Sequence, residues 1–212
     1  MGLFDSAAQS AKPLFYGRIA VKDRSKPVFE LTSKDTWAVT EVSAIDGNIT
    51  GLQYTENTDK EGKVIKGYRL TFDAPDGVLF LSIGFTQVGR SLMNSLLSLT
   101  KADNVRLSLY KNKEGYDNIG LTQNWEKISW KFPMSEVPRP EELGVVDWRK
   151  VLKWDNTNEF FKKHLDEKFI GTGFSFATPS NDFVASAHTE STPVASEDLP
   201  DMSEGHGSPW QE

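Results

Sequence analysis

The sequence predicts a mainly β protein: a small antiparallel barrel with one inserted helix, then a C-terminal amphipathic helix and a disordered acidic tail. Three observations carry this prediction. Most of residues 14–132 fall into short segments in which apolar and polar residues alternate, the period of a β-strand. One segment, 85–100, instead repeats its apolar residues at helical spacing. From residue 171 onward the chain becomes acidic and rich in small residues.

The predicted strands are separated by turn signals. Asp46-Gly47 is a strong hairpin signal, and the run from Ala74 to Gly77 contains the Pro-Asp-Gly sequence of a tight turn. The segments expected as strands are 14–21, 37–45, 48–54, 63–73, 78–83, 105–111, 116–122 and 125–132.

Helical periodicity is clearest over 85–100, where Val88, Leu92 and Leu96 share one face. Prolines after residue 132 mark a connector, 141–157 shows weaker helical spacing, and 158–169 predicts an amphipathic helix. We therefore expect a barrel domain over 1–132, a connector and C-terminal helix packed on the barrel over 133–170, and a flexible acidic tail over 171–212.

Consecutive antiparallel strands with a single helix inserted late describe a small β-barrel capped by that helix. The oligonucleotide/oligosaccharide-binding (OB) barrel is the best-known arrangement of this kind. A β-sandwich is the alternative, but a helix in the middle of the chain fits a sandwich less well.

Charge is distributed unevenly along the 212 residues, whose formal net charge is −6. All 24 lysines and arginines lie within 1–170, together with 23 of the 30 acids. The body therefore carries about +1 and the tail −7. Such asymmetry is typical of an acidic interaction tail attached to a neutral or basic domain.

Composition also limits the chemistry. The chain has no cysteine, which excludes disulfides, iron–sulfur clusters, cysteine-based zinc sites and thiol nucleophiles. Of its three histidines only His164 lies outside the predicted tail. We therefore expect a protein that is not an enzyme and has no metal or cofactor. No apolar run is long enough for a signal peptide or a membrane span, so a cytoplasmic protein without a membrane partner is expected.

Alternation along the predicted strands places aromatic and cationic side chains together on the outward face. Cations can follow the phosphates of single-stranded nucleic acid while flat aromatic faces stack its unpaired bases. The pattern therefore predicts a binding surface for single-stranded DNA. The residues expected to form it are Tyr16, Arg18, Arg69, Arg106, Tyr110, Lys111, Lys113, Tyr116, Trp125, Lys127 and Lys131.

The tail interleaves acids with apolar residues near its end. Tethered beside a cationic groove, such a segment would occupy that groove at high effective concentration until nucleic acid displaced it. We expect the partner-binding residues of the tail to be Glu197, Asp198, Leu199, Asp201, Met202, Glu204 and Trp210.

This combination resembles the single-stranded DNA-binding proteins of bacteriophages. The resemblance covers roughly 14–132 and 190–212 and depends on the barrel-like strand order, the run from Glu197 to Met202, and Trp210 near the end. It departs from the family because the apolar tip is not the last residue and 133–170 has no counterpart. It implies that the protein coats and protects single-stranded DNA during phage replication, recombination and repair in the host cytoplasm. It also implies that the tail recruits replication proteins such as a polymerase, helicase or primase.

Two other classes remain open at this point. One is a structural or virion-associated β-domain whose tail binds another protein, and the other is a carbohydrate-binding module, since exposed tryptophan and tyrosine also stack on sugars. Salt dependence separates both from a nucleic-acid-binding protein, because contacts to phosphates release counterions. The sequence also leaves formation of a homodimer open.

Overall fold

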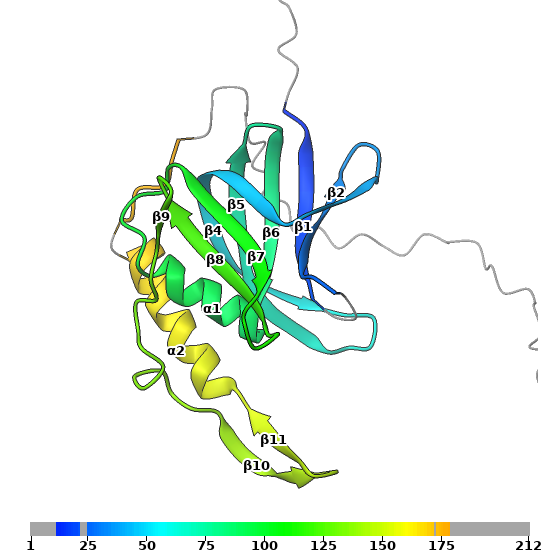
Figure 1. Cartoon of the computed structure of the whole chain (residues 1–212), viewed down its shortest axis with the longest axis vertical. Helices are drawn as coiled ribbons and strands as arrows, with labels where there is room; N and C mark the ends of the chain where they lie inside the picture. Colours follow the sequence, from blue (N-terminus) through cyan, green and yellow to red (C-terminus); the bar gives the residue numbers. More distant parts are fainter. Residues whose placement is uncertain (1–11, 22–24, 172, 179–212) are drawn as a thin grey trace, which may run out of the picture.

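The computed structural model describes residues 12–21, 25–171 and 173–178. Over these residues the chain is mainly β, as predicted. Nine strands form one sheet in the order β3-β2-β1-β6-β5-β4-β7-β8-β9 (Figure 1). Their bounds are β1 Leu14–Ala20, β2 Val28–Ser33, β3 Val39–Val42, β4 Ala44–Thr58, β5 Val64–Ala74, β6 Gly77–Gly84, β7 Val105–Lys111, β8 Asp117–Gln123 and β9 Glu126–Lys127.

The sheet is curled but no closed barrel is found. No pairing joins β3 to β9 at the two ends of the strand order within the described residues. All neighbours are antiparallel except β1 and β6, which pair in parallel from Leu14 and Val78 onward. The predicted barrel closure is therefore not observed.

The core lies inside the curl, where α1 (Gln87–Leu96) and α2 (Asp155–Asp166) cover the sheet (Figure 1). Interior residues of the central strands, including Leu70, Phe72 and Leu81, are almost completely buried. The side chain of Thr86 caps α1 by accepting a hydrogen bond from the Gly89 amide at 3.1 Å. A π-helical turn, η1 (Glu167–Gly171), extends α2.

α2 is attached to the sheet through Tyr68 of β5. Its phenolic oxygen donates a hydrogen bond to Asp166 at 2.9 Å, and Lys162 forms an ion pair with the same carboxylate at 2.7 Å. Burial, with the Asp166 hydrogen bond as the next cause, raises the pKa of Tyr68 far above its ordinary value. After η1 the chain returns to the body, where Phe174 and Phe176 pack on Phe169. Residues 173–178, expected in the tail, thus belong to the folded body.

Several sequence predictions are confirmed. Strands occur at 14–20, 64–74, 77–84 and 105–111, close to the predicted bounds, and 117–123 matches 116–122. The helix expected over 85–100 is α1, and the helix expected over 158–169 is α2 with η1. Strand β2 was not predicted.

The prediction of a turn at Asp46-Gly47 is wrong, because both residues lie inside the long strand β4. There β4 passes so close to β5 that a Cβ on Gly47 would lie 2.6 Å from the Asp73 carbonyl oxygen. Glycine is therefore required at residue 47 by a close approach of two backbones rather than by a turn.

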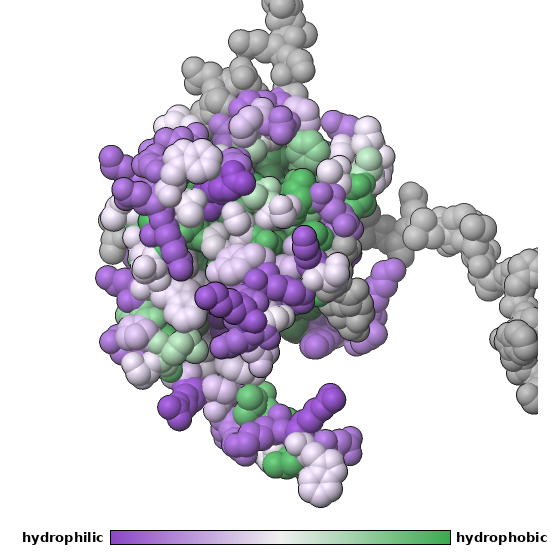
Figure 2. Space-filling view, in the orientation of Figure 1, coloured by the Kyte–Doolittle hydropathy of each residue, from purple (hydrophilic) through white to green (hydrophobic). Residues whose placement is uncertain are grey.

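The prediction of helical structure over 141–157 is also wrong for its larger part. Residues 141–153 form a β-hairpin, with β10 at Glu141–Val146 and β11 at Arg149–Lys153. Asp147 and Trp148 make a two-residue turn with φ of 48° and 63°. This hairpin projects from the body as a separate two-stranded sheet (Figures 1 and 2).

The strand expected over 125–132 is reduced to Glu126–Lys127. Trp130, which follows that short strand, is exposed. Among the described residues no helix is long and apolar enough to cross a membrane. Over the same part of the chain, no group of three or more acidic or histidine side chains could hold a metal ion.

Candidate nucleic-acid interface

The outer, convex face of the sheet carries a patch formed by β1, β6 and β5. In the pairing of β1 with β6, Tyr16 lies opposite Phe80 and Arg18 lies opposite Ser82. In the pairing of β6 with β5, Ser82 also lies opposite Arg69. Directly opposite residues share one face of a sheet, so four of these side chains project outward together. We name Tyr16, Arg18, Arg69 and Phe80 the outer patch.

Contacts within the outer patch are those of aromatic and cationic groups. The Tyr16 and Phe80 rings have centroids 6.1 Å apart at an angle of 33°. The Arg69 guanidinium lies 5.8 Å from the centroid of the Phe80 ring. Tyr16 keeps 42% of its surface exposed, so its ring is accessible to a ligand.

The two arginines of the patch differ in their partners. Arg18 forms an ion pair with Glu30 of β2, which lies directly opposite it. Arg69 makes no ion pair with any residue that the structure describes. Within the described part of the chain, it is therefore the cation of the outer patch whose charge no carboxylate compensates.

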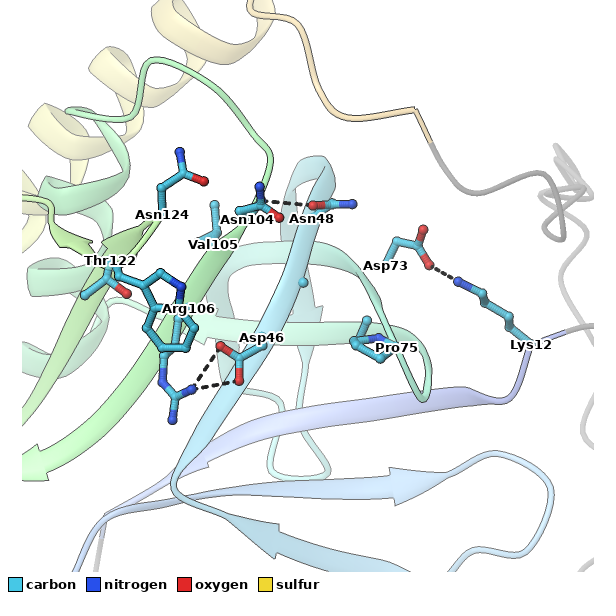
Figure 3. A pocket seen from close by; sticks show the side chains of 13 residues that line it. Lys12, Asp46, Asn48, Asp73, Pro75, Asn104, Val105, Arg106, Thr122 and Asn124 are labelled. Atoms are coloured by element: carbon cyan, nitrogen blue, oxygen red, sulfur yellow. Dashed lines mark hydrogen bonds and ion pairs between the residues drawn. The ribbon is translucent and has the colours of Figure 1, made fainter.

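A second cluster forms around Trp125, which occupies the turn between β8 and β9 with φ of 69°. Trp125 is 84% exposed, and the Arg106 guanidinium of β7 lies 5.7 Å from the centroid of its ring. Arg106 also donates hydrogen bonds to both carboxylate oxygens of Asp46 at 3.0 and 3.2 Å (Figure 3). The indole and guanidinium thus form a wall held in position by a carboxylate.

This wall borders a groove of about 810 Å³, which we name the Trp125 groove. Lys12 and Asp73, joined by a 2.8 Å ion pair, form its opposite side (Figure 3). Between the two sides, the Asn104 amide donates to the Asn48 side chain at 3.0 Å. The groove therefore offers stacking surface, cations and amide groups within one depression.

The groove and the outer patch adjoin. Along β5, the buried Asp73 of the groove lies on the same face of the sheet as Arg69 of the patch, with Thr71 between them on that face. Four steps between neighbouring strands separate β7 from β1, which corresponds to about 19 Å. An extended ligand could contact both clusters along one face.

Other predicted residues lie elsewhere. Tyr110 and Lys127 are exposed on the outer face at β7 and β9. Lys111, Lys113 and Tyr116 surround the β7–β8 turn, where Lys111 pairs with Asp117 at 3.0 Å.

Lys131 is not part of either cluster. Its amide donates to the Asn94 carbonyl of α1, and its charge contributes to lowering the pKa of Lys168, after burial as the larger cause. Because α1 covers the interior of the curl, Lys131 lies on the helical side of the molecule. The structure does not bring it together with the outer patch.

Sequence reasoning missed Phe80, Asp46 and Lys12. Phe80 lies in the apolar run VLFLSI, which indicates a strand buried on both faces, whereas Phe80 and Ser82 lie on the outward face. Tyr16 lies directly opposite Phe80 on the paired strand β1 and could have indicated that Phe80 faces outward. This signal can be used only once the β1–β6 pairing is known.

Comparisons with known proteins found no matching family model, no matching curated protein and no matching solved structure.

Proposed function

We propose that this protein binds single-stranded DNA without sequence specificity, using the outer patch and the Trp125 groove. The proposal is based on the outward-facing group of Tyr16, Phe80 and Arg69, in which two aromatic rings adjoin a cation that has no ion pair among the described residues. Bases stacking on such rings gain roughly 1–3 kcal/mol each, and every base has a face to stack. Arg69 and Lys127 would contact phosphates.

We also propose that the strands from β4 to β8 form an OB-like arrangement. The strands β4, β5 and β6, followed by α1 and then β7 and β8, give the order of an OB domain, and β4 pairs with both β5 and β7. In such domains the second and third strands and two flanking loops bind oligonucleotides. The corresponding elements here are β5 and β6, which hold Arg69 and Phe80, and the β7–β8 turn with Lys113 and Tyr116.

Two cations of the proposed interface already form ion pairs with carboxylates, and this affects how strongly DNA should bind. Glu30 and Asp46 already compensate Arg18 and Arg106, so a phosphate must replace a carboxylate at each position. Binding should therefore be sensitive to salt and to removal of these acids.

The path of the chain just before the tail supports a role for the tail at the Trp125 groove. The Ala177 amide donates to the Ile49 carbonyl at 3.0 Å, one residue from Asn48 in the Trp125 groove. The chain therefore leaves its described body beside this groove. We propose that the tail competes with DNA there and recruits replication proteins. Its predicted residues, 197–210, lie outside the described residues.

With these parts, the proposed role is that of a non-enzymatic DNA-coating protein in phage replication, recombination and repair in the host cytoplasm. A structural interaction domain is the second candidate, favoured by the exposed apolar hairpin at 141–153.

The test is a titration with oligo-dT, followed by tryptophan fluorescence, at about 50 and about 200 mM salt. Duplex DNA of equal length serves as competitor. We expect the intact chain to prefer the single strand, to bind more weakly at higher salt, and to bind more tightly after truncation at residue 178. Arg69→Ala should weaken binding, whereas Lys163→Ala on α2 should not. Absence of binding by both forms at low salt would refute the proposal.

A further inference from the structure

The β10–β11 hairpin is an arm that touches little of the rest of the protein. All thirteen residues from Glu141 to Lys153 are exposed, and the hairpin forms a sheet of its own (Figure 1). With strands of five and six residues it extends about 20 Å. An isolated two-stranded hairpin is only marginally stable in water. We therefore expect contact with a partner to stabilise this arm.

Its side chains are apolar to a degree unusual for an exposed hairpin. Trp148 at the tip is fully exposed, and the arm shows green apolar side chains in Figure 2. The turn residues Asp147 and Trp148 both adopt positive φ, which costs roughly 1 kcal/mol or more for each non-glycine residue. The exposed apolar residues of the arm are Leu143, Val145, Val146, Trp148, Val151 and Leu152.

A second groove, of about 810 Å³, lies at the base of the arm. Pro140 and Trp154, the residues that flank the arm in the chain, are part of its lining. Three further lining residues, Tyr116, Trp130 and Met134, are large apolar groups with 60%, 44% and 64% of their surface exposed. We name this depression the arm-base groove.

The walls of the arm-base groove are held in place by hydrogen bonds. The Thr157 hydroxyl donates to the Pro138 carbonyl at 2.7 Å, and the Asn94 side chain donates to the Phe132 carbonyl at 2.8 Å. The Arg90 guanidinium stacks on Trp154 with its carbon 3.8 Å from the ring centroid. The groove therefore exists before any partner arrives, and a ligand need not order it.

We propose that two copies of this chain form a dimer by exchanging arms, with Trp148 of each copy seated in the arm-base groove of the other. Because the groove and the arm adjoin in one chain, a single two-fold axis satisfies both contacts at once. The arm and the groove lining together offer more than twenty residues per copy, the number used by a standard-size interface. The exchange would cover nine of the seventeen exposed large apolar side chains of the described chain.

The charge of the arm favours a protein over nucleic acid as its partner. Glu141, Glu142 and Asp147 balance Arg149, Lys150 and Lys153, so the arm has no net attraction for phosphates. Balanced charge is compatible with a second copy of the same chain. The proposal does not depend on DNA binding, but the two surfaces share Tyr116, which the arm of the partner copy would cover.

Oligomeric state is the first test, measured by sedimentation velocity on the full chain over a range of concentrations. We expect a dimer, and we expect loss of the dimer in the double variant Trp148→Ser, Leu152→Lys. The matched control is Trp37→Ser, which changes another exposed turn tryptophan with φ of 57° and should leave the dimer intact. A wild-type chain that stays monomeric at every concentration would overturn the proposal.

Cross-linking then tests which surfaces meet. The natural chain has no cysteine, so single introduced thiols give unambiguous products. A chain with Trp148→Cys is mixed with a chain with Met134→Cys and oxidised mildly. We expect a disulfide that joins the two different chains. Cross-links confined to chains with Trp148→Cys would show that arms pair with arms, and arm exchange would be wrong.

Discussion

Arg106 is held by Asp46 in the geometry that places its guanidinium beside Trp125. Both side chains are partly exposed, so the pair contributes little to stability, but Asp46 competes with any phosphate for Arg106. On the proposed function, Asp46→Asn should strengthen DNA binding by up to about 1 kcal/mol, roughly fivefold. Fluorescence titration with oligo-dT measures this.

Glu136→Gln in the connector is the control, since it removes the same charge outside both clusters. Equal gains in the two variants would attribute the effect to net charge rather than to Arg106.

Trp125 and Trp37 provide a matched pair of exposed turn tryptophans, both with positive φ. Of the two, Trp125 lies beside a groove and a guanidinium, whereas no such neighbour of Trp37 is found among the described residues. Loss of one stacked base costs roughly 1–3 kcal/mol, so we expect Trp125→Ala to weaken DNA binding by about five- to 150-fold. Trp37→Ala should change the affinity little. The dissociation constants come from filter binding, and equal losses in both variants would contradict the proposed interface.

For single residues, the alternation of apolar and polar residues predicted which side chains face outward, but only in strands whose bounds were themselves predicted correctly. Tyr16, Arg18 and Arg69 share one face as expected, because β1 and β5 have nearly the predicted bounds. Trp125 was predicted on a strand and instead occupies a turn, since Asn124 and Trp125 both adopt positive φ without a glycine to mark it. The ion pair between Arg18 and Glu30 depends on the register between β1 and β2. The residue pattern within either strand alone does not specify that register.

At the scale of elements, the arm shows why helical spacing misled the prediction over 141–157. Trp148, Val151 and Leu152 have the spacing of a helix face. In the structure, however, Trp148 lies in the turn, and Val151 and Leu152 lie in the short strand that follows it. The β-branched pair Val145–Val146 favours extended structure, and Gly144 disfavours a helix; together they outweigh that spacing. The two-residue turn lacks the Asn-Gly or Asp-Gly sequence by which such turns are recognised.

Helix α1 depends on a close approach at Gly89. A Cβ at this position would lie 1.9 Å from the Gly84 carbonyl oxygen, which is backbone and cannot rotate away. Helix propensity alone favours alanine by about 1 kcal/mol, whereas forcing a methyl group into a packed site costs about 1–3 kcal/mol. We expect the clash to prevail, so Gly89→Ala should lower the free energy of unfolding in urea denaturation. Gly51→Ala, whose Cβ would meet nothing closer than 3.5 Å, is the control, and a stabilised Gly89→Ala would show that the backbone yields easily.

For the whole molecule, the sheet's openness could not be predicted from strand patterns. Pairing between distant strands decides whether a barrel closes, and here β1 occupies the free edge of β6 in a parallel pairing. Residues 14 and 78 are far apart in the chain, and nothing local in either strand specifies that contact. Strand existence was therefore predictable for most of the sheet, whereas closure was not.

Attachment of α2 to the sheet through Tyr68 makes the stability of the whole molecule sensitive to alkaline pH. Burial and the hydrogen bond to Asp166 raise the pKa of Tyr68 in the folded state. The folded protein therefore retains a proton that the unfolded chain loses above the ordinary tyrosine pKa of about 10. The stabilisation is complete below that pH and is lost as the pH rises toward the folded-state pKa.

We therefore expect the free energy of unfolding to fall steeply as the pH rises above about 10, and Tyr68→Phe to reduce that fall. At neutral pH the variant should lose about 1 kcal/mol, the contribution of one hydrogen bond. Denaturation in urea at each pH measures both quantities. Tyr110→Phe, which changes an exposed tyrosine on β7, provides the control. If the wild-type and Tyr68→Phe chains declined in parallel, the alkaline sensitivity would originate elsewhere, and the Tyr68–Asp166 contact would not be what couples α2 to the sheet.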